Sequence, residues 1–192
     1  MSDHVTITRA PGAQNASFER INASQSQMVF WKNEDNVAHW PLFSTGAPPP
    51  SLLYQVGANG TSDSLQPALA LANPPKQGES CPVTYTCKIH SGESGKINIY
   101  ADFFPQPNQL KGATRGVAYT ANLTNGGLPP YKKLRVSNSN LPAGLTVNNV
   151  TDQGPVLSGT PGLGDAGSFA FDLYCEDSDG NNVTQTYLLT VS

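Results

Sequence analysis

The residues with the clearest chemical potential are one cysteine and two histidines. Cys87 and His90 stand three positions apart in a short polar segment between two stretches rich in β-branched residues, and His39 lies far upstream. One thiolate and two imidazoles form the trigonal ligand set of mononuclear blue-copper sites. The pattern therefore predicts a metal centre whose ligands come from separate hairpins.

The cysteine count bears on whether Cys87 is free to bind a metal. The chain has three cysteines, Cys81, Cys87 and Cys175, so at least one of them has no disulfide partner within the chain. Along an extended strand the Cα atoms of Cys81 and Cys87 would lie about 20 Å apart, whereas a disulfide needs about 5.5 Å. Two alternatives remain. Either Cys87 binds metal while Cys81 and Cys175 are free or joined to each other, or a sharp turn near Pro82 pairs Cys81 with Cys87 and abolishes the site.

Strands are expected on both sides of these ligands. Residues rich in β-branched and aromatic side chains predict strands at 5–8, 28–33, 39–43, 83–89 and 96–100. Residues 65–71 fit either a short helix or a strand, and the rest of 44–79 is rich in proline and loop residues, including Pro48-Pro49-Pro50. A short loop between rigid strands would hold the thiolate and the imidazole of the Cys/His segment in a preset geometry.

Two blocks of sequence carry a resemblance to a known family. Trp31-x-Asn33 is followed by five intervening residues and then His39, and Tyr85-x-Cys87-x2-His90 continues into x2-Glu93-x-Gly95-Lys96. These blocks resemble the cupredoxins, and the amicyanin and plastocyanin group most closely. The resemblance covers residues 5–102, although 44–80 match poorly, and implies a Greek-key β-sandwich with one mononuclear copper ion bound by His39, Cys87 and His90.

The fourth ligand position departs from that family. In the amicyanin spacing Glu93 stands where the axial methionine is expected, and in the longer plastocyanin spacing the position falls on Gly95. The chain has two methionines, Met1 at the terminus and Met28 in the upstream strand, and neither is expected to substitute. A carboxylate is a hard anionic donor that favours Cu(II) over Cu(I), so ligation by Glu93 would lower the reduction potential. The alternative is that Glu93 is a solvated loop residue and the axial position is empty or holds water.

The chain beyond this segment has a different character. Proline and polar residues at 104–113 read as a linker, and 114–192 shows short predicted strands at 117–120, 133–136, 145–147, 156–158, 168–174 and 185–191. Leu141-Pro142-Ala143-Gly144-Leu145 and Leu157-Ser158-Gly159-Thr160-Pro161 resemble motifs of the immunoglobulin-like repeats of bacterial surface proteins. We therefore expect an all-β chain with a cupredoxin domain at 1–103, a linker at 104–113 and an immunoglobulin-like β-sandwich at 114–192.

The composition of the chain limits the classes of molecule that it can be expected to bind. Charged residues are 13% of the 192 residues and the net charge is −3, without a cluster of lysine and arginine, which argues against nucleic acid. No apolar run approaches the roughly 20 residues of a membrane span, and residues 1–4 do not begin a signal peptide. The profile suits a periplasmic or extracellular protein whose leader has been removed. The oligomeric state is left open.

Calcium is not expected. Glu176, Asp177 and Asp179 offer oxygen donors of the kind that Ca²⁺ prefers. An Asp-Gly hairpin turn, however, needs no ion, and we expect a solvated turn at this position.

These patterns lead to three functional hypotheses. The first is an exported copper protein that transfers single electrons to a redox partner protein, with Glu93 as an atypical axial ligand. The second is copper storage, exchange with a copper donor or acceptor protein, or redox chemistry at an open site, and the third is a metal-free adhesive or structural module. With His39 and His90 assigned to metal there is no general-base histidine, so we assign no catalytic residue and expect a carrier rather than an enzyme.

Overall fold

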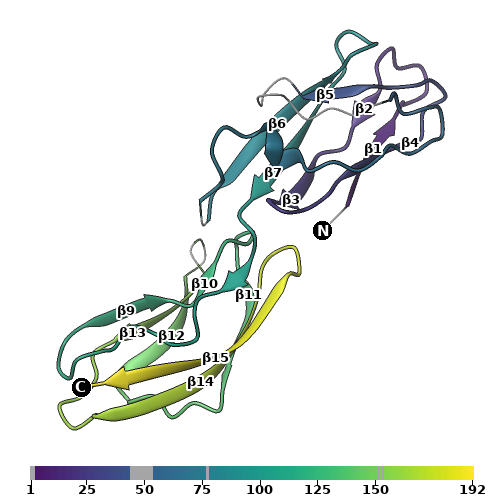
Figure 1. The fold of residues 1–192 in the computed structure, drawn as a ribbon. Coiled ribbons are helices and arrows are strands. Elements are labelled where there is room, and N and C mark those ends of the chain that lie inside the picture. The colour runs from purple at the N-terminus through teal and green to yellow at the C-terminus, as the bar shows by residue number, and fades with distance from the viewer. Residues whose placement is uncertain (1–2, 44–53, 77, 151, 153) are drawn as a thin grey trace. The chain divides into compact units, whose positions relative to one another are not determined.

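The computed structural model describes residues 3–43, 54–76, 78–150, 152 and 154–192. Within these residues the chain forms strands and one short 3-10 helix, which confirms the predicted all-β class. It divides into two compact units, Met1–Ala101 and Asp102–Ser192 (Figure 1). None of the described helical residues makes a helix long and apolar enough to cross a membrane.

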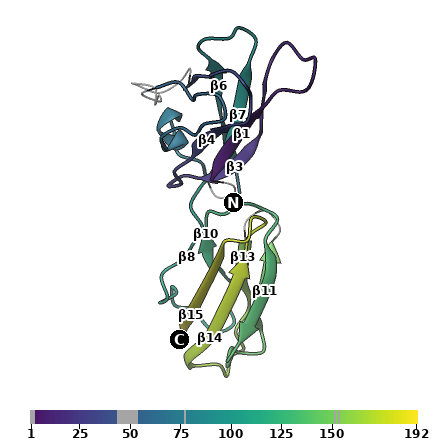
Figure 2. The same cartoon turned by 90° about the vertical axis from the view of Figure 1, so that its right-hand side faces the viewer.

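The first unit contains two sheets. One has the strand order β2-β1-β4, with β1 at His4–Thr8, β2 at Ser17–Phe18 and β4 at Phe30–Asn33. The other has the order β3-β7-β6-β5, with β3 at Ile21–Ser24, β7 at Ser94–Tyr100, β6 at Ser80–Cys87 and β5 at Pro41–Phe43. The pairs β1/β4 and β3/β7 are parallel, and the other pairs are antiparallel. Figure 2 shows these strands from the side, with the helix of Pro67–Ala70 next to them.

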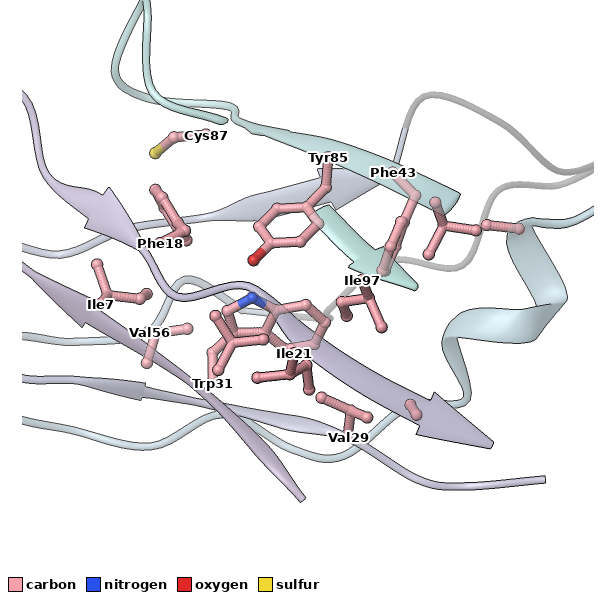
Figure 3. Packing of buried hydrophobic residues seen from close by; sticks show 14 of the residues in the cluster. Ile7, Phe18, Ile21, Val29, Trp31, Phe43, Val56, Tyr85, Cys87 and Ile97 are labelled. Atoms are coloured by element: carbon pink, nitrogen blue, oxygen red, sulfur yellow. The ribbon is translucent and has the colours of Figure 1, made fainter. Parts of the chain in front are cut away.

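The core of the first unit is an aromatic cluster that draws on both sheets. Trp31 of β4 makes edge-to-face contacts with Phe43 of β5 and Tyr85 of β6, at ring-centroid distances of 5.9 and 5.5 Å. The alternation of β6 turns Val83, Tyr85 and Cys87 to the inside. Cys87 is therefore the last inward side chain of β6 and lies at the edge of the apolar core (Figure 3).

The second unit is also built from two main sheets. One has the order β12-β13-β9, with β12 at Leu145–Val150, β13 at Gly154–Gly159 and β9 at Tyr119–Asn122. The other has the order β11-β14-β15, with β11 at Lys132–Ser137, β14 at Gly167–Glu176 and β15 at Asn182–Val191. Buried side chains from both sheets form one core, which includes Leu145, Leu157, Phe171, Leu173, Tyr187 and Leu189. This is a sandwich-type arrangement.

Two glycines of the recognised motifs meet in the second unit. The Thr160 amide donates to the Gly144 carbonyl at 2.9 Å, and Leu145 stands opposite Gly159 in the β12/β13 ladder. A Cβ on Gly159 would lie 2.0 Å from the Gly144 oxygen, and Gly159 has a φ of +137°. Only glycine fits this backbone approach without strain.

Several segments differ in detail from the expectations. Residues 104–113 add to the second unit: β8 at Phe104–Pro105 pairs with β10 at Thr124–Asn125, and Leu110 and Ala113 are buried in the core. The ambiguous stretch at 65–71 forms the 3-10 helix Pro67–Ala70. Residues 88–89, expected as the end of a strand, belong to the loop after β6. The prolines at 48–50 lie outside the described residues.

Candidate metal centre

Pairing between β5 and β6 sets the position of Cys87. Pro41 stands opposite Cys87 in the ladder, so the chain just before β5 runs past the thiol. The Trp40 amide donates to Cys87 Sγ at 3.4 Å, and the Lys88 amide donates to the Trp40 carbonyl at 2.8 Å. His39 is held beside them by two backbone hydrogen bonds with Val56. The upstream histidine is thereby anchored next to the thiol although the two are far apart in sequence.

A tight loop after β6 supplies the other two side chains. The Cys87 amide donates to the Glu93 carbonyl at 3.0 Å, which closes the loop. Gly92 has a φ of +84°, a conformation that glycine adopts without a steric penalty. The closed loop turns His90 and Glu93 back toward Cys87.

The four predicted donors converge on one point. Nδ1 of His39, Sγ of Cys87, Nδ1 of His90 and a Glu93 carboxylate oxygen all lie within 4.8 Å of one another. The two histidine nitrogens are 3.3 Å apart, and Cys87 Sγ lies 3.9 Å from that of His39 and 3.6 Å from that of His90. Glu93 Oε2 is 2.9 Å from His39 Nδ1 and 3.3 Å from His90 Nδ1.

The separations among the two imidazole nitrogens and the thiol sulfur, 3.3–3.9 Å, are close to those of donors around a single small ion. With bonds of about 2.1 Å to nitrogen and about 2.3 Å to sulfur, tetrahedral donors lie about 3.4 Å (N to N) and about 3.6 Å (N to S) apart. A thiolate, a carboxylate oxygen and two imidazole nitrogens also all carry lone pairs, and their convergence without a cation or shared protons is unfavourable. The residues therefore fit one first-row metal ion in both spacing and chemistry.

Burial distinguishes one donor from the other three. His39, Cys87 and Glu93 are buried, with 0%, 6% and 2% of their surface exposed. The side chain of His90 is 33% exposed. Solvent therefore reaches the centre at His90.

Glu93 is not the solvated loop residue of the alternative expectation. Its Oε1 accepts a hydrogen bond from the Ala16 amide at 2.8 Å and lies 3.4 Å from Arg9 Nη2. Burial raises the pKa of Glu93, but the Ala16 amide and the two neighbouring histidines outweigh it, so the pKa lies below its usual value. The carboxylate is held ionised, with Oε2 turned toward the other donors.

Asp35 is a residue of the centre that the sequence analysis does not find. Its Oδ2 lies 3.0 Å from His39 Nε2 and accepts a hydrogen bond from Arg9 Nε at 2.8 Å. Both ring nitrogens of His39 therefore face a carboxylate, Nε2 that of Asp35 and Nδ1 that of Glu93. A metal ion bound at Nδ1 would leave the proton on Nε2, where the Asp35 carboxylate accepts it. Burial opposes ionisation of Asp35, but the hydrogen bonds from Arg9, His39 and Asn36 bring its pKa below the usual value.

The turn that carries Asp35 is built by Asn33. Its side-chain amide donates to the carbonyls of Val37 at 2.7 Å and Gly57 at 2.9 Å, and its Oδ1 accepts from the Asp35 amide at 2.9 Å. Asn33 is buried, so these bonds fix the turn between β4 and His39. The only hint in the sequence is an acidic residue four positions before a predicted histidine ligand.

The side chain of Trp40 lies beside the centre and is only partly buried. Lys88 Nζ sits 4.1 Å from the centroid of its ring, a cation–π contact. Ile89, in the same loop, is exposed. Trp40 and Ile89 therefore form apolar surface near the exposed His90.

The cysteines are all free in this structure. Cys87 is buried at the centre, Cys81 is half-buried on β6, and Cys175 is buried in the second unit. The alternative that pairs Cys81 with Cys87 is therefore wrong. Both lie on the single extended strand β6, which keeps them apart.

Asp177 has a structural use in the second unit. It is fully buried, and its carboxylate accepts hydrogen bonds from the amides of Leu128, Asp179 and Asn181 and from the Asn181 side chain. These bonds join the β14–β15 turn to the segment before β11. The expected turn is present, but the expectation that it is solvated is wrong for Asp177, which is buried and hydrogen-bonded.

Comparison with known proteins identifies the family. A sequence profile of the Putative Ig domain family matches residues 79–192, more than half of the chain. The chain belongs to this family. In this Ig-family protein the match covers all of the second unit and also β6 and β7 of the first, so it includes Cys87, His90 and Glu93.

Solved structures with some likeness to this Ig-family protein are distant. An endo-fucoidan hydrolase of glycoside hydrolase family 107 is 19% identical over 89% of the chain, with a TM-score of 0.39. A three-domain Ig structure of titin I67–I69, in an E-to-A variant, is 11% identical over 92%, with a TM-score of 0.43. A tetra-tandem repeat from the extending region of a large adhesion protein is 15% identical over 100%, with a TM-score of 0.27.

These likenesses carry no argument about function. The chain spans 27% of the length of the fucoidan hydrolase, 64% of that of the titin structure and 50% of that of the adhesion-protein repeat. No curated protein matches the Ig-family sequence significantly.

Proposed function

We propose that the first unit is a cupredoxin-like domain that binds one copper ion through His39, Cys87, His90 and Glu93, and that it transfers single electrons. The observation that carries this proposal is the convergence of the four donor atoms within 4.8 Å. A thiolate with two imidazoles is the donor set that suits copper electron-transfer sites. The hydrogen bond from the Trp40 amide to Cys87 Sγ and the β5/β6 pairing that presents it also support a rigid site.

Each residue has a distinct part in this proposal. Cys87 and the two histidines hold the ion, and bound copper would supply a one-electron couple between Cu(I) and Cu(II). Glu93 adds a hard anionic oxygen that favours the divalent state. Because buried hydrogen bonds fix three of the donors, the protein holds nearly the same geometry in both states. His90, the exposed ligand, faces the partner.

The decisive test is addition of Cu(II) to the metal-free full-length protein. The wild type is expected to develop an intense thiolate-to-copper absorption band with one copper per chain by metal analysis. Cys87→Ser is expected to abolish the band, whereas Cys81→Ser, the same change on the same strand outside the centre, keeps it. A wild type without the band, purified from copper-supplied cells without bound copper, would refute the proposal.

Family membership favours a second candidate, an adhesive or structural module. The Ig-like match over residues 79–192 supports an extracellular spacer role for the second unit. Both functions suit one exported protein, in which the Ig-like unit holds the first unit at its place of action. If no metal binds, the structural role alone remains.

Electrochemistry separates electron transfer from copper storage or open-site chemistry. Fast, reversible cycling of the copper-loaded protein is expected for the rigid site. Slow cycling together with binding of added azide would favour storage, exchange or small-molecule chemistry.

A further inference from the structure

Arg9 contacts both carboxylates of the candidate metal centre and one backbone carbonyl. Its Nε donates to Asp35 Oδ2 at 2.8 Å, its Nη1 donates to the Gln14 carbonyl at 2.5 Å, and its Nη2 lies 3.4 Å from Glu93 Oε1. The Arg9 side chain is 25% exposed, and both carboxylates are almost fully buried. One guanidinium thus contacts both Asp35, which faces His39 Nε2, and Glu93, which faces His39 Nδ1.

The sheet topology makes this bridge possible. Strands β1 and β4 are parallel, with Ile7 opposite Asn33, and the Glu34 amide donates to the Ile7 carbonyl. Two residues further along each chain, Arg9 and Asp35 therefore emerge side by side at the same end of the sheet. The register of this pair places a cation next to the carboxylate that orients His39.

Arg9 also acts on Glu93 by a second, indirect route. By bonding to the Gln14 carbonyl it holds the loop after β1, and that loop presents the Ala16 amide to Glu93 Oε1 at 2.8 Å. Two donors therefore face Oε1, whereas Oε2 faces His39 Nδ1 at 2.9 Å and His90 Nδ1 at 3.3 Å. The two oxygens of one carboxylate have separate partners.

We propose that Arg9 is the positioning residue of this centre: it holds Glu93 so that only Oε2 can reach the ion, and it makes the site selective for a divalent over a monovalent metal. This inference rests on the proposed metal-binding function and adds the residue that sets its selectivity. The guanidinium faces two buried carboxylates, those of Asp35 and Glu93. The positive charge of Arg9 by itself opposes a bound cation, and a divalent one most. The selectivity therefore rests on the placement of the hard oxygen Oε2, which suits a divalent ion better than Cu(I).

The test compares Arg9→Met with Arg20→Met in the full-length protein. Arg20 is an exposed arginine of the same unit, so its replacement makes the same charge change away from the donors. Co(II) and Cu(I) affinities are measured by competition with chelators, and unfolding curves of the metal-free proteins check that each variant folds. Loss of a residue that orients metal ligands typically lowers affinity about 10–100-fold.

The expected result is specific to the divalent ion. Arg9→Met lowers Co(II) affinity by that factor, leaves Cu(I) affinity nearly unchanged, and weakens the visible Co(II) bands because Glu93 is free to bind through both oxygens. In the metal-free protein the Ala16 amide loses its protection from hydrogen exchange. Arg20→Met changes none of these. Arg9→Lys, which keeps the charge but lacks the forked donors, restores the affinity only in part.

Three results would overturn the proposal. They are equal losses of Co(II) and Cu(I) affinity in Arg9→Met, the same behaviour in Arg9→Met and Arg20→Met, and full recovery by Arg9→Lys. A wild type that binds neither ion would instead refute the proposed function itself. The two failures are therefore distinguishable in one experiment.

Discussion

Replacing Glu93 by glutamine changes the charge of the proposed centre with little change in shape. The side chain is buried, and its Oε1 accepts the Ala16 amide while Oε2 faces the two histidines. In Glu93→Gln the carboxamide oxygen can keep the Ala16 hydrogen bond, which turns its NH2 group toward the imidazoles. An amide NH2 does not bind metal, and the reverse orientation would set it against the Ala16 amide and Arg9. The variant therefore loses both a negative charge and a ligand.

The size of the effect follows from electrostatics. One charge about 4 Å away, in surroundings with an effective dielectric constant of about 20, contributes about 4 kcal/mol per unit of charge on the ion. Cu(II) and Cu(I) differ by one unit, and about 1.4 kcal/mol corresponds to about 59 mV for one electron. We expect the reduction potential of Glu93→Gln to rise by on the order of 100 mV or more, toward the limit of about 170 mV that these figures give. Arg9, left without part of its counter-charge, acts in the same direction.

Spectroelectrochemistry of the copper-loaded full-length protein measures this rise. Glu79→Gln, the same change at an exposed position of the first unit, is expected to leave the potential almost unchanged because solvent screens it. Competition titrations should show a matching loss of Cu(II) affinity and little change for Cu(I). An unchanged or lower potential in Glu93→Gln, or an equal loss for both ions, would contradict the assignment of Glu93 as a ligand.

Two further predictions concern the two units separately. In Gly95→Ala the new Cβ would lie 2.2 Å from the Tyr85 ring. We therefore expect the free energy of unfolding of the first unit to fall by about 1–3 kcal/mol. Urea unfolding followed by the fluorescence of the two tryptophans, both in the first unit, measures it, and Gly57→Ala, with no atom within 4 Å, should be neutral. In the second unit, burial and nearby acidic charge raise the pKa of Cys175 from 9.0 to about 11. At pH 8 iodoacetamide should modify Cys81 but spare Cys175 until the protein unfolds, as peptide mass spectrometry can show. Over this range the folded state keeps the Cys175 proton, whereas the unfolded state releases it. The stability of the second unit should therefore fall between about pH 9 and about pH 11. Modification of native Cys175, or a stability that rises over that range, would contradict this.

The part of the centre that the sequence predicts is the part set by local spacing. Cys87, His90 and Glu93 lie in one short loop, so their order limits where their side chains can go. The strand-and-turn pattern before His39 predicts it as a further ligand, and the structure brings it to the same point. Whether these residues bind copper stays a prediction.

The contact between Arg9 and Asp35 could not be predicted from the sequence, for a physical reason. Their contact depends on the parallel register of β1 with β4, a pairing between segments that no local pattern announces. The burial of Glu93 likewise depends on the Ala16 amide in a loop distant in sequence. Residues 104–113 look like a linker because they are polar and rich in proline, yet short pairings and the side chains of Leu110 and Ala113 join them to the second core. Long-range pairing decides each of these cases.

The unequal exposure of the four donors has a kinetic consequence. An ion bound as proposed would not be able to leave by a single dissociation, because His39, Cys87 and Glu93 are buried. Exchange would begin at His90, the partly exposed donor, where an incoming ligand could displace one bond while the other three hold. Metal transfer at such a centre would then proceed through a shared intermediate with the acceptor, and its rate would rise with acceptor concentration rather than follow spontaneous release.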